Sequence, residues 1–303
     1  MAKNTHMLLN LLPEIQLGNI KSLARCISGI ENQDPESALL LKKLPPSKTP
    51  VIGFTGPPGA GKSTIVNGLI GSFVKQHKKV AVLCIDPSSP FHHGAFLGDR
   101  IRMNQWTGNS NVFIRSLSSR GSLGGLNPRI YEISDLLKAA PFDYILIETV
   151  GIGQSELEIA GIADFTVVIL TPGSGDDIQA LKSGILEIAD LFVVNKSDYP
   201  DAKHFISNLQ SALSLGSKNI DIMETVATEG KGIDELASVI VNKLTAGAGR
   251  GHHHLAEKVV RLMLAEKMKE IDKTDLLDKI NMESQLDNFN VYVFVENYLS
   301  GIK

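Results

Sequence analysis

The sequence is poor in features that would assign it to several common protein classes. Its 303 residues include only two cysteines, Cys26 and Cys84, which lie far apart and match no metal-ligand spacing. We therefore expect a reducing compartment and no disulfide framework. No apolar run approaches the ~18 residues that span a bilayer, and the first residues resemble neither a secretory signal nor a transit peptide. These absences predict a cytoplasmic protein with no membrane partner.

A broad excess of positive charge is also absent. The formal net charge is −3, so no basic surface suited to nucleic acid is expected. Hydrophobic residues make up 43% of the chain and charged residues 21%, which is ordinary for a soluble globular protein. The length suits one large α/β domain with appendages.

Short apolar runs alternate with longer, more polar stretches through the middle of the chain. Runs typical of strands occupy residues 51–55, 80–85, 111–115, 143–148, 165–170 and 190–194. Several are apolar at nearly every position, as in strands buried on both faces of a parallel sheet. We predict an α/β fold with a doubly wound, mainly parallel sheet over residues 47–246, with ligand loops at the carboxyl ends of the strands.

Helical segments are expected on both sides of this domain. Residues 1–46 form a helical N-terminal extension that ends at Pro45-Pro46. After the glycine-rich break at 246–251, residues 247–303 form a helical C-terminal arm, with helices over 255–268, near 274–283 and at 291–295. The apolar residues of this arm serve either dimerisation or packing on the protein's own core.

The strongest motif follows the run at 51–55 and precedes a helix that starts near Thr64. It reads Gly56, Pro57, Pro58, Gly59, Ala60, Gly61, Lys62 and Ser63, which is the phosphate-binding P-loop pattern in its strand–loop–helix context. Its glycines let backbone N–H groups wrap a diphosphate, and the helix N-terminus adds positive dipole there. Lys62 then neutralises the β- and γ-phosphates, and the Ser63 hydroxyl ligates Mg²⁺.

Acidic residues end two other predicted strands. Asp86 follows the second run, where it either binds Mg²⁺ or its waters, or caps a turn. Glu148 ends the fourth run, at the position where a carboxylate holds Mg²⁺ in P-loop proteins. Gly151 can bring a backbone N–H close to the γ-phosphate and act as a switch hinge.

A base-reading motif follows the sixth run. The Asp198 carboxylate can accept two hydrogen bonds from guanine, whereas adenine offers no matching pair of donors. Lys196 can lie along the base, and Asn195 can connect this loop to the P-loop. A further loop, Val226-Ala227-Thr228, is expected at the base edge.

Together these residues resemble the MeaB/ArgK family, the G-protein chaperones of adenosylcobalamin-dependent acyl-CoA mutases. Six stretches carry the resemblance: 56–63, Asp86-Pro-Ser-Ser-Pro90, Leu97-Gly-Asp-Arg100, Arg120-Gly-Ser-Leu-Gly-Gly125, Glu148-Thr-Val-Gly-Ile-Gly-Gln-Ser155 and Asn195-Lys-Ser-Asp198. Residues 175–190 look like the additional switch segment of that family. The resemblance covers residues 45–245 strongly and the two ends loosely.

The resemblance implies roles for individual residues. Lys62 contacts phosphates, Ser63 and Asp99 hold Mg²⁺, and Asp198 reads guanine. Asp86 and Glu148 act in the water shell of the metal or orient the attacking water, so Lys62, Asp86 and Glu148 are the expected catalytic residues. The family binds and slowly hydrolyses GTP to GDP. It gates cofactor loading and protects a mutase, typically methylmalonyl-CoA mutase, and its members are generally homodimers.

The chain departs from the family in two loops. His92-His93 replaces a small residue and a glycine in the first switch loop. Val226 replaces a serine in the base-edge loop, although Ala227 keeps an amide that can reach the guanine carbonyl.

Two other functions stay open. An ATP-using kinase or ATPase linked to amino-acid transport is opposed by the Asn195–Asp198 motif. A metal-insertion GTPase would be expected to carry Cys/His clusters near its switches, where this chain has only His92-His93.

Overall fold

The computed structural model describes residues 7–86, 103–119, 126–149, 158–173, 184–214, 220–247, 256, 258–260, 262–264, 267–268, 271–285 and 289–301. The chain divides into two compact units, Met1–Gly251 and His252–Lys303. Among the described residues, no helix combines the length and the apolar character needed to cross a membrane.

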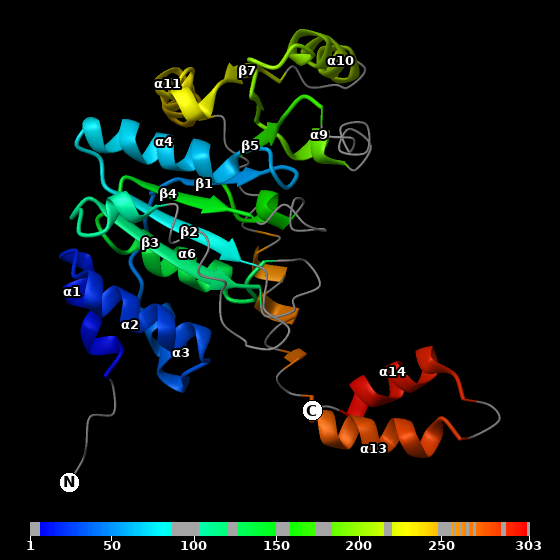
Figure 1. Ribbon diagram of the computed structural model, residues 1–303. Coiled ribbons are helices and arrows are strands. Elements are labelled where there is room, and N and C mark those ends of the chain that lie inside the picture. Colours follow the sequence, from blue (N-terminus) through cyan, green and yellow to red (C-terminus); the bar gives the residue numbers. More distant parts are fainter. Residues whose placement is uncertain are drawn as a thin grey trace. The chain divides into compact units, whose positions relative to one another are not determined.

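The first unit is built on a seven-stranded sheet in which all pairings are parallel, in the order β3-β2-β4-β1-β5-β6-β7 (Figure 1). The strands are β1 Val51–Thr55, β2 Val80–Asp86, β3 Val112–Ser118, β4 Tyr144–Glu148, β5 Phe165–Leu170, β6 Leu191–Asn195 and β7 Ile222–Thr225. All six predicted strands are present, and the doubly wound parallel sheet is confirmed. The seventh strand, β7, is an addition to the six.

The central strands owe their conformation to burial on both faces. Every residue of β1, β2, β5 and β6 is buried, which explains their unbroken apolar runs. Gly53, in the middle of β1, is required by a close approach: a Cβ there would lie 2.6 Å from Cγ1 of Ile159. β7 is an edge strand with only its last residue buried, so its apolar signal is weak.

Helices cover the two faces of this sheet (Figure 1). α4 (Lys62–Lys75) and α11 (Ile233–Thr245) share one apolar core with one face of the strands, and Ile233 packs against Gly68 of α4. α2 (Ile20–Glu31) and α6 (Ile130–Lys138) share a second core on the opposite face. The remaining elements of this unit are η1 Leu9–Leu11, α1 Leu12–Gln16, α3 Pro35–Lys42, η2 Asn104–Trp106, η3 Ile159–Gly161, α9 Ile185–Ile188, α10 Ala202–Ser214 and η4 Ala227–Glu229.

The N-terminal helices are part of the first unit and share its core. Leu23 and Ile27 of α2 are buried against α6 and the strands. Asn19 begins α2 by accepting hydrogen bonds from the amides of Lys21 and Ser22, a standard helix cap. Arg115 of β3 then joins α2 to the sheet, because its guanidinium donates to Glu31 Oε2 at 2.6 Å.

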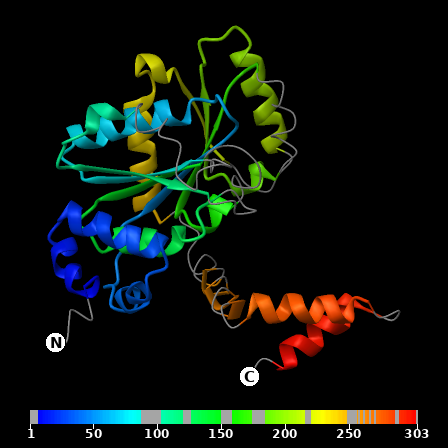
Figure 2. The ribbon, with the colours of Figure 1, turned by 60° about the horizontal axis from the view of Figure 1, so that its bottom comes forward.

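The second unit contains α13 (Lys273–Glu283) and α14 (Val291–Gly301), which lie side by side as a helical hairpin (Figures 1 and 2). Its preceding residues 256, 258–260, 262–264 and 267–268 are also helical. The predicted helices near 274–283 and at 291–295 are thus confirmed. Phe294 of α14 is buried, and its ring contacts those of Phe289, which precedes the helix, and Tyr298, one turn further along it.

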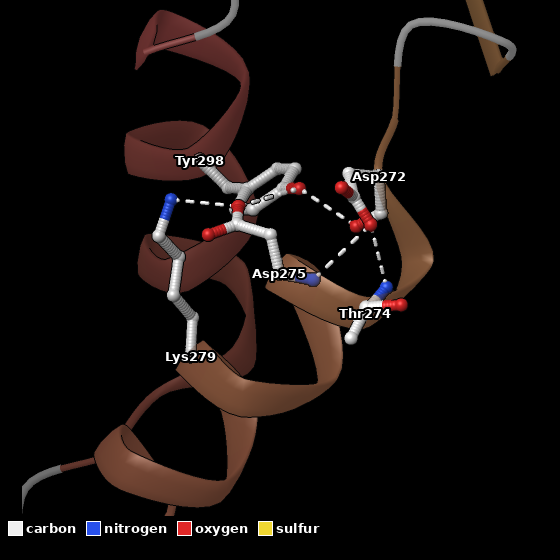
Figure 3. A network of polar contacts seen from close by, with 5 residues as sticks. All are labelled: Asp272, Thr274, Asp275, Lys279 and Tyr298. Carbon is white, nitrogen blue, oxygen red and sulfur yellow. Dashed lines mark hydrogen bonds and ion pairs between the residues drawn. The ribbon is translucent and has the colours of Figure 1, made fainter.

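Polar contacts also join these two helices (Figure 3). Asp272 caps α13 by accepting from the amides of Thr274 and Asp275, and the Tyr298 hydroxyl lies 3.3 Å from Asp275 Oδ2. Lys279 donates to the same carboxylate at 2.8 Å and lies over the Tyr298 ring. The Lys279 hydrogen bond lowers the pKa of Asp275.

Candidate nucleotide-binding site

The predicted site residues that the structure describes lie at or just after the carboxyl ends of the parallel strands. β1 is central, and the chain continues from it to β2 on one side and later to β5 and β6 on the other. This is a topological switch point, where the loops after parallel strands separate and leave a crevice for ligands. The P-loop follows β1, Glu148 ends the adjacent strand β4, Asp86 ends β2 beyond it, and the base-reading segment begins at the end of β6 on the other side.

The P-loop conformation requires glycine at two positions. Gly56 has φ 139° and Gly61 has φ 91°, both in the region that other residues avoid. A Cβ on Gly56 would collide with the carbonyl oxygen of Ile169 in β5, and one on Gly61 would collide with Nδ2 of Asn195. The loop is therefore packed directly against the neighbouring strand and the base-reading segment.

Lys62 is held over this loop. Its Nζ donates to the carbonyl oxygens of Gly56 at 2.8 Å and Pro57 at 3.0 Å, and the residue is only 6% exposed. α4 begins at Lys62, so its first amide groups face the same place. A buried ammonium group and a helix N-terminus together form a site for phosphate groups.

Three oxygen-bearing side chains lie at the ends of α4, β4 and β2. The Ser63 hydroxyl donates to Glu148 Oε1 at 2.5 Å, and both residues are buried. Cys84 pairs with Glu148 in the sheet, so Asp86, also buried, ends β2 beside that carboxylate. A hydroxyl and two carboxylates are hard oxygen donors, which fits Mg²⁺ and not a soft transition metal. Asp99 lies outside the described residues.

A pair of threonines connects the end of β4 to the strand that leads into the P-loop. Thr149 Oγ1 donates to Thr55 Oγ1 at 3.0 Å, and the Thr149 amide donates to Phe54 O at 3.0 Å. Both hydroxyls are buried. The sequence analysis missed Thr55 and this pairing, since only the register of β1 and β4 brings the two residues together. Gly151, two residues on, lies outside the described residues.

Asn195 joins the base-reading segment to the P-loop, as the sequence predicts. Its Nδ2 donates to Ala60 O at 2.8 Å. Its Oδ1 accepts from Thr225 Oγ1 and from the Ala227 amide, both at 3.1 Å. The Ala227 amide that the sequence places at the guanine carbonyl thus already has an acceptor, and a bound base would share it or take it over. Thr225 is a further residue that the sequence analysis missed.

The outer part of the base-reading segment is open to solvent. Lys196 adopts a left-handed conformation with φ 58°, which turns the chain so that Asp198 is exposed. Next to it, residues 226–231 form a small turn closed by an antiparallel bridge between Val226 and Lys231. Val226 is buried and Thr228 is exposed.

The electrostatic surroundings of this turn favour a charged lysine. The Lys231 ammonium lies 2.6 Å from Glu229 Oε2, and this contact raises the pKa of Lys231. The Asp198 carboxylate makes a smaller contribution in the same direction. Lys231 therefore lies within the electrostatic field of the residue expected to read guanine.

The structure connects the described residues of the predicted site in two places: Ser63 of the P-loop helix contacts Glu148, and Asn195 joins the base-reading segment to the P-loop. His92 and His93, like Asp99 and Gly151, lie outside the described residues. Within the described part of the chain, no group of three or more His, Cys, Asp or Glu side chains is placed to hold a metal ion.

Comparison with known proteins gives consistent results. The family model for MeaB, described as methylmalonyl Co-A mutase-associated GTPase, matches residues 23–285. The GTPase ArgK of Escherichia coli is 33% identical over 292 residues, covering 91% of this chain and 86% of ArgK. The mitochondrial methylmalonic aciduria type A homolog of Mus musculus is 38% identical over 193 residues, covering 61% of this chain and 46% of that protein. A crystal structure of a LAO/AO transport system kinase matches with a TM-score of 0.69 at 27% identity, covering 89% of this chain and 86% of that one.

Proposed function

The chain belongs to the MeaB family of methylmalonyl-CoA mutase-associated GTPases, and on that basis we propose that it binds GTP, hydrolyses it with Mg²⁺ and acts as the chaperone of an adenosylcobalamin-dependent acyl-CoA mutase. In this role the nucleotide state gates cofactor loading and protects the mutase. The single observation that carries the nucleotide part is Asn195, whose side chain contacts both the P-loop and the base-edge loop.

Guanine recognition is supported by the position of Asp198. Asn195 ends β6 next to the P-loop, and three residues later Asp198 is exposed on the same segment. A carboxylate there offers two acceptors to the two adjacent donors of guanine, whereas adenine would leave it without them. In this proposal the segment from Asn195 to Asp198 spans from the phosphate-binding loop to the guanine base.

Phosphate binding and hydrolysis rest on charge and position. Lys62 and the α4 N-terminus neutralise the phosphate oxygens. In hydrolysis a water oxygen forms a bond to the γ-phosphorus, the bond to the β–γ bridging oxygen breaks, and GDP leaves with the electron pair. Ser63, Glu148 and Asp86 would hold Mg²⁺ or its waters, and that ion supplies neutralisation of the developing charge.

A homodimer is the third part of the proposal, and the second unit supports it. Its helical residues expose many large apolar side chains, with between 41% and 82% of each residue accessible: Val259, Val260, Leu262, Met263, Leu264, Met268, Leu277, Met282, Val291, Tyr292, Val293 and Val295. A monomer rarely leaves so much apolar surface in contact with water. A second copy of the arm would cover it.

The test is GTP hydrolysis by the purified chain, alone and with an adenosylcobalamin-dependent acyl-CoA mutase from the same cell. We expect slow turnover that rises when the mutase is added, and none with the Lys62→Ala variant. Slow turnover that no such mutase changes would support the GTPase activity but contradict the proposed mutase partner. Turnover that persists in Lys62→Ala would contradict the phosphate assignment itself.

An ATP-using kinase is the second candidate, favoured by the likeness to the LAO/AO transport system kinase structure. Competition against labelled GTP distinguishes the two. The GTPase proposal expects ATP to compete at least about 100-fold more weakly, because a site that hydrogen-bonds guanine rejects a base lacking its donors. Equal competition by ATP would favour the kinase.

A further inference from the structure

β3 forms one edge of the sheet and pairs with β2 alone among the described strands. The Val80 amide donates to Asn111 O at 2.8 Å, and the Ser119 amide donates to Asp86 O at 3.0 Å, which fixes the register of the ladder. In a parallel pair with this register, alternate residues of β3 exchange hydrogen bonds with β2. The peptide groups of the residues between them, Ile114 and Ser116, point away from β2, toward the outer side of the edge strand.

These outward groups have no hydrogen-bond partner among the described residues, whereas the two ends of the edge do. The Val112 amide donates to Asn109 O, and Asn127 Nδ2 donates to Ser118 O at 2.8 Å. Within the same part of the chain, the Ser116 hydroxyl oxygen is buried and also lacks a partner. Buried polar groups without partners cost stability, and most native structures satisfy them. The middle of this edge is thus a row of donors and acceptors able to pair with another chain.

A cavity of about 470 Å³ runs beside this row. Its floor is β3 itself, at Val112–Arg115. One wall is α2, through Ile20 and Ala24, and the other is η2 and the turn after it, through Met103, Trp106 and Thr107. α2 belongs to the core on one face of the sheet, and Trp106 packs against the core on the other. The cavity is therefore a channel along the sheet edge, bounded by α2 on one side and by η2 and its following turn on the other.

The charges around the channel favour an acidic occupant. Lys21 and Arg25 are exposed on α2. Lys21 follows Ile20 and Arg25 follows Ala24, and the two basic residues are one helical turn apart. On the opposite side, the polar residues among the described positions 103–108 are the uncharged Asn104, Gln105 and Thr107. Glu31 is paired with Arg115. The rim is thus positive on the α2 side.

We propose that this edge is a peptide-binding site, at which an extended segment of a partner protein adds to β3 as an eighth strand. The segment is apolar at alternate positions, to fill the channel, and carries an acidic residue beside Lys21 and Arg25. Its backbone pairs with the peptide groups of Ile114 and Ser116, which a helix cannot do because its own groups are already paired. A second copy of β3 is a poor occupant because its own Lys21 and Arg25 would come with it to an already positive rim. β3 lies three strands away from β1, which leads into the P-loop, and the proposal does not rest on the proposed nucleotide chemistry.

The test uses the full chain and synthetic peptides of about ten residues with alternating Val and Thr and an Asp near one end. Trp106 is the only tryptophan and lines the channel, so its fluorescence reports binding directly. Residue-resolved amide hydrogen exchange provides an internal control. We expect peptide to slow exchange at Ile114 and Ser116 by about tenfold or more, and to leave Arg115 and Leu117 unchanged because they already pair with β2.

Three outcomes would overturn the proposal. The first is slow exchange at Ile114 and Ser116 in the free chain, which would mean that the protein covers its own edge. The second is equal binding of a matched peptide in which Lys replaces Asp, or of a helical peptide, which would remove the charge and backbone arguments. A Trp106 response without protection of the two amides would also count against strand addition.

Variants add a second readout. Ser116→Pro removes an outward N–H without touching the ladder to β2, since proline is tolerated on the open side of an edge strand. Ser116→Ala keeps that N–H and is the matched control. We expect Ser116→Pro to weaken peptide binding about tenfold and Ser116→Ala to retain it. If Ser116→Pro fails to fold, Ala24→Met narrows the channel from α2 without changing its charge, and undiminished binding by that variant would contradict the site.

Discussion

The Ser63 hydroxyl and the Glu148 carboxylate are joined by a hydrogen bond of 2.5 Å, although 85 positions separate them in the chain. The bond links the start of the P-loop helix to the end of β4. It forms because Phe54 pairs with Glu148 in the sheet, so the loop after β1 and the end of β4 emerge side by side. One buried contact thus joins a residue proposed to bind the nucleotide and its metal to the carboxylate proposed to hold that metal.

This contact predicts different effects for two substitutions. Ser63→Ala removes the hydroxyl, so we expect a loss of about 1–3 kcal/mol in stability and a loss of Mg²⁺-dependent hydrolysis. Glu148→Gln keeps an oxygen that accepts from Ser63 but removes the charge, so the stability loss should be smaller while Mg²⁺ affinity falls about 10- to 100-fold. Chemical denaturation and Mg²⁺ titration of hydrolysis measure the two quantities. Equal behaviour of both variants in both assays would contradict this division.

Substitution of Asn195 is predicted to lower both the stability of the fold and the affinity for GTP. Asn195→Ala removes three hydrogen bonds, and we expect a stability loss of about 2–4 kcal/mol together with weaker GTP binding. Thr225→Val is the matched control because it removes one of those bonds and leaves the contact with Ala60. Its stability loss should be about 1 kcal/mol, with GTP affinity nearly retained. Similar GTP affinities in the two variants would show that the contact with the P-loop is unimportant.

The parts of this fold that the sequence predicts are those with a local signal. Strands buried on both faces give unbroken apolar runs, as at Phe165–Leu170, and the P-loop glycines stand where backbone conformation requires them. The sequence does not mark β7 as a strand, because its edge position leaves three of its four residues at least partly exposed. Local composition cannot show this difference, since the exposure of an edge strand depends on what lies beside it.

Contacts between distant residues account for what the sequence could not show. Thr55 meets Thr149, and Thr225 meets Asn195, only because particular strands are neighbours in a particular register. Arg115 joins the N-terminal helices to β3 because α2 packs on the sheet there, which the sequence around neither residue shows. The motif around Asn195 did predict its contact with the P-loop, because the residue type and its place at a strand end carry that information together.

Base selectivity is predicted to reside in Asp198. Asp198→Asn replaces one of two acceptors with a donor, which opposes guanine but matches the carbonyl oxygen of xanthine. We expect GTP affinity to fall by about 100-fold or more and xanthosine triphosphate to gain relative to it. Lys231→Ala is the control, because Lys231 lies in the field of Asp198 and is paired with Glu229. It should leave the ratio of the two affinities unchanged; a Lys231→Ala variant that shifts this ratio as far as Asp198→Asn would mean that charge, and not hydrogen bonding, selects the base.

Cys26 gives a prediction for alkaline pH. The residue lies on α2 with no exposed surface, its thiol is 3.7 Å from Leu8 O, and burial raises its pKa from 9.0 to about 11. The folded chain therefore keeps the proton that the unfolded chain releases between those values. This contribution to stability is complete below pH 9 and is lost as the pH rises to about 11, by at most about 2–3 kcal/mol.

Other groups titrate in the same range, so the free energy of unfolding is measured from pH 8 to 11 in the wild type and in Cys26→Ala. We expect the wild type to lose more stability than the variant over this range, since the variant has no thiol to ionise. Parallel curves would show that the Cys26 thiol ionises as readily in the folded chain as in the unfolded one, and that the N-terminal helices admit water at this position.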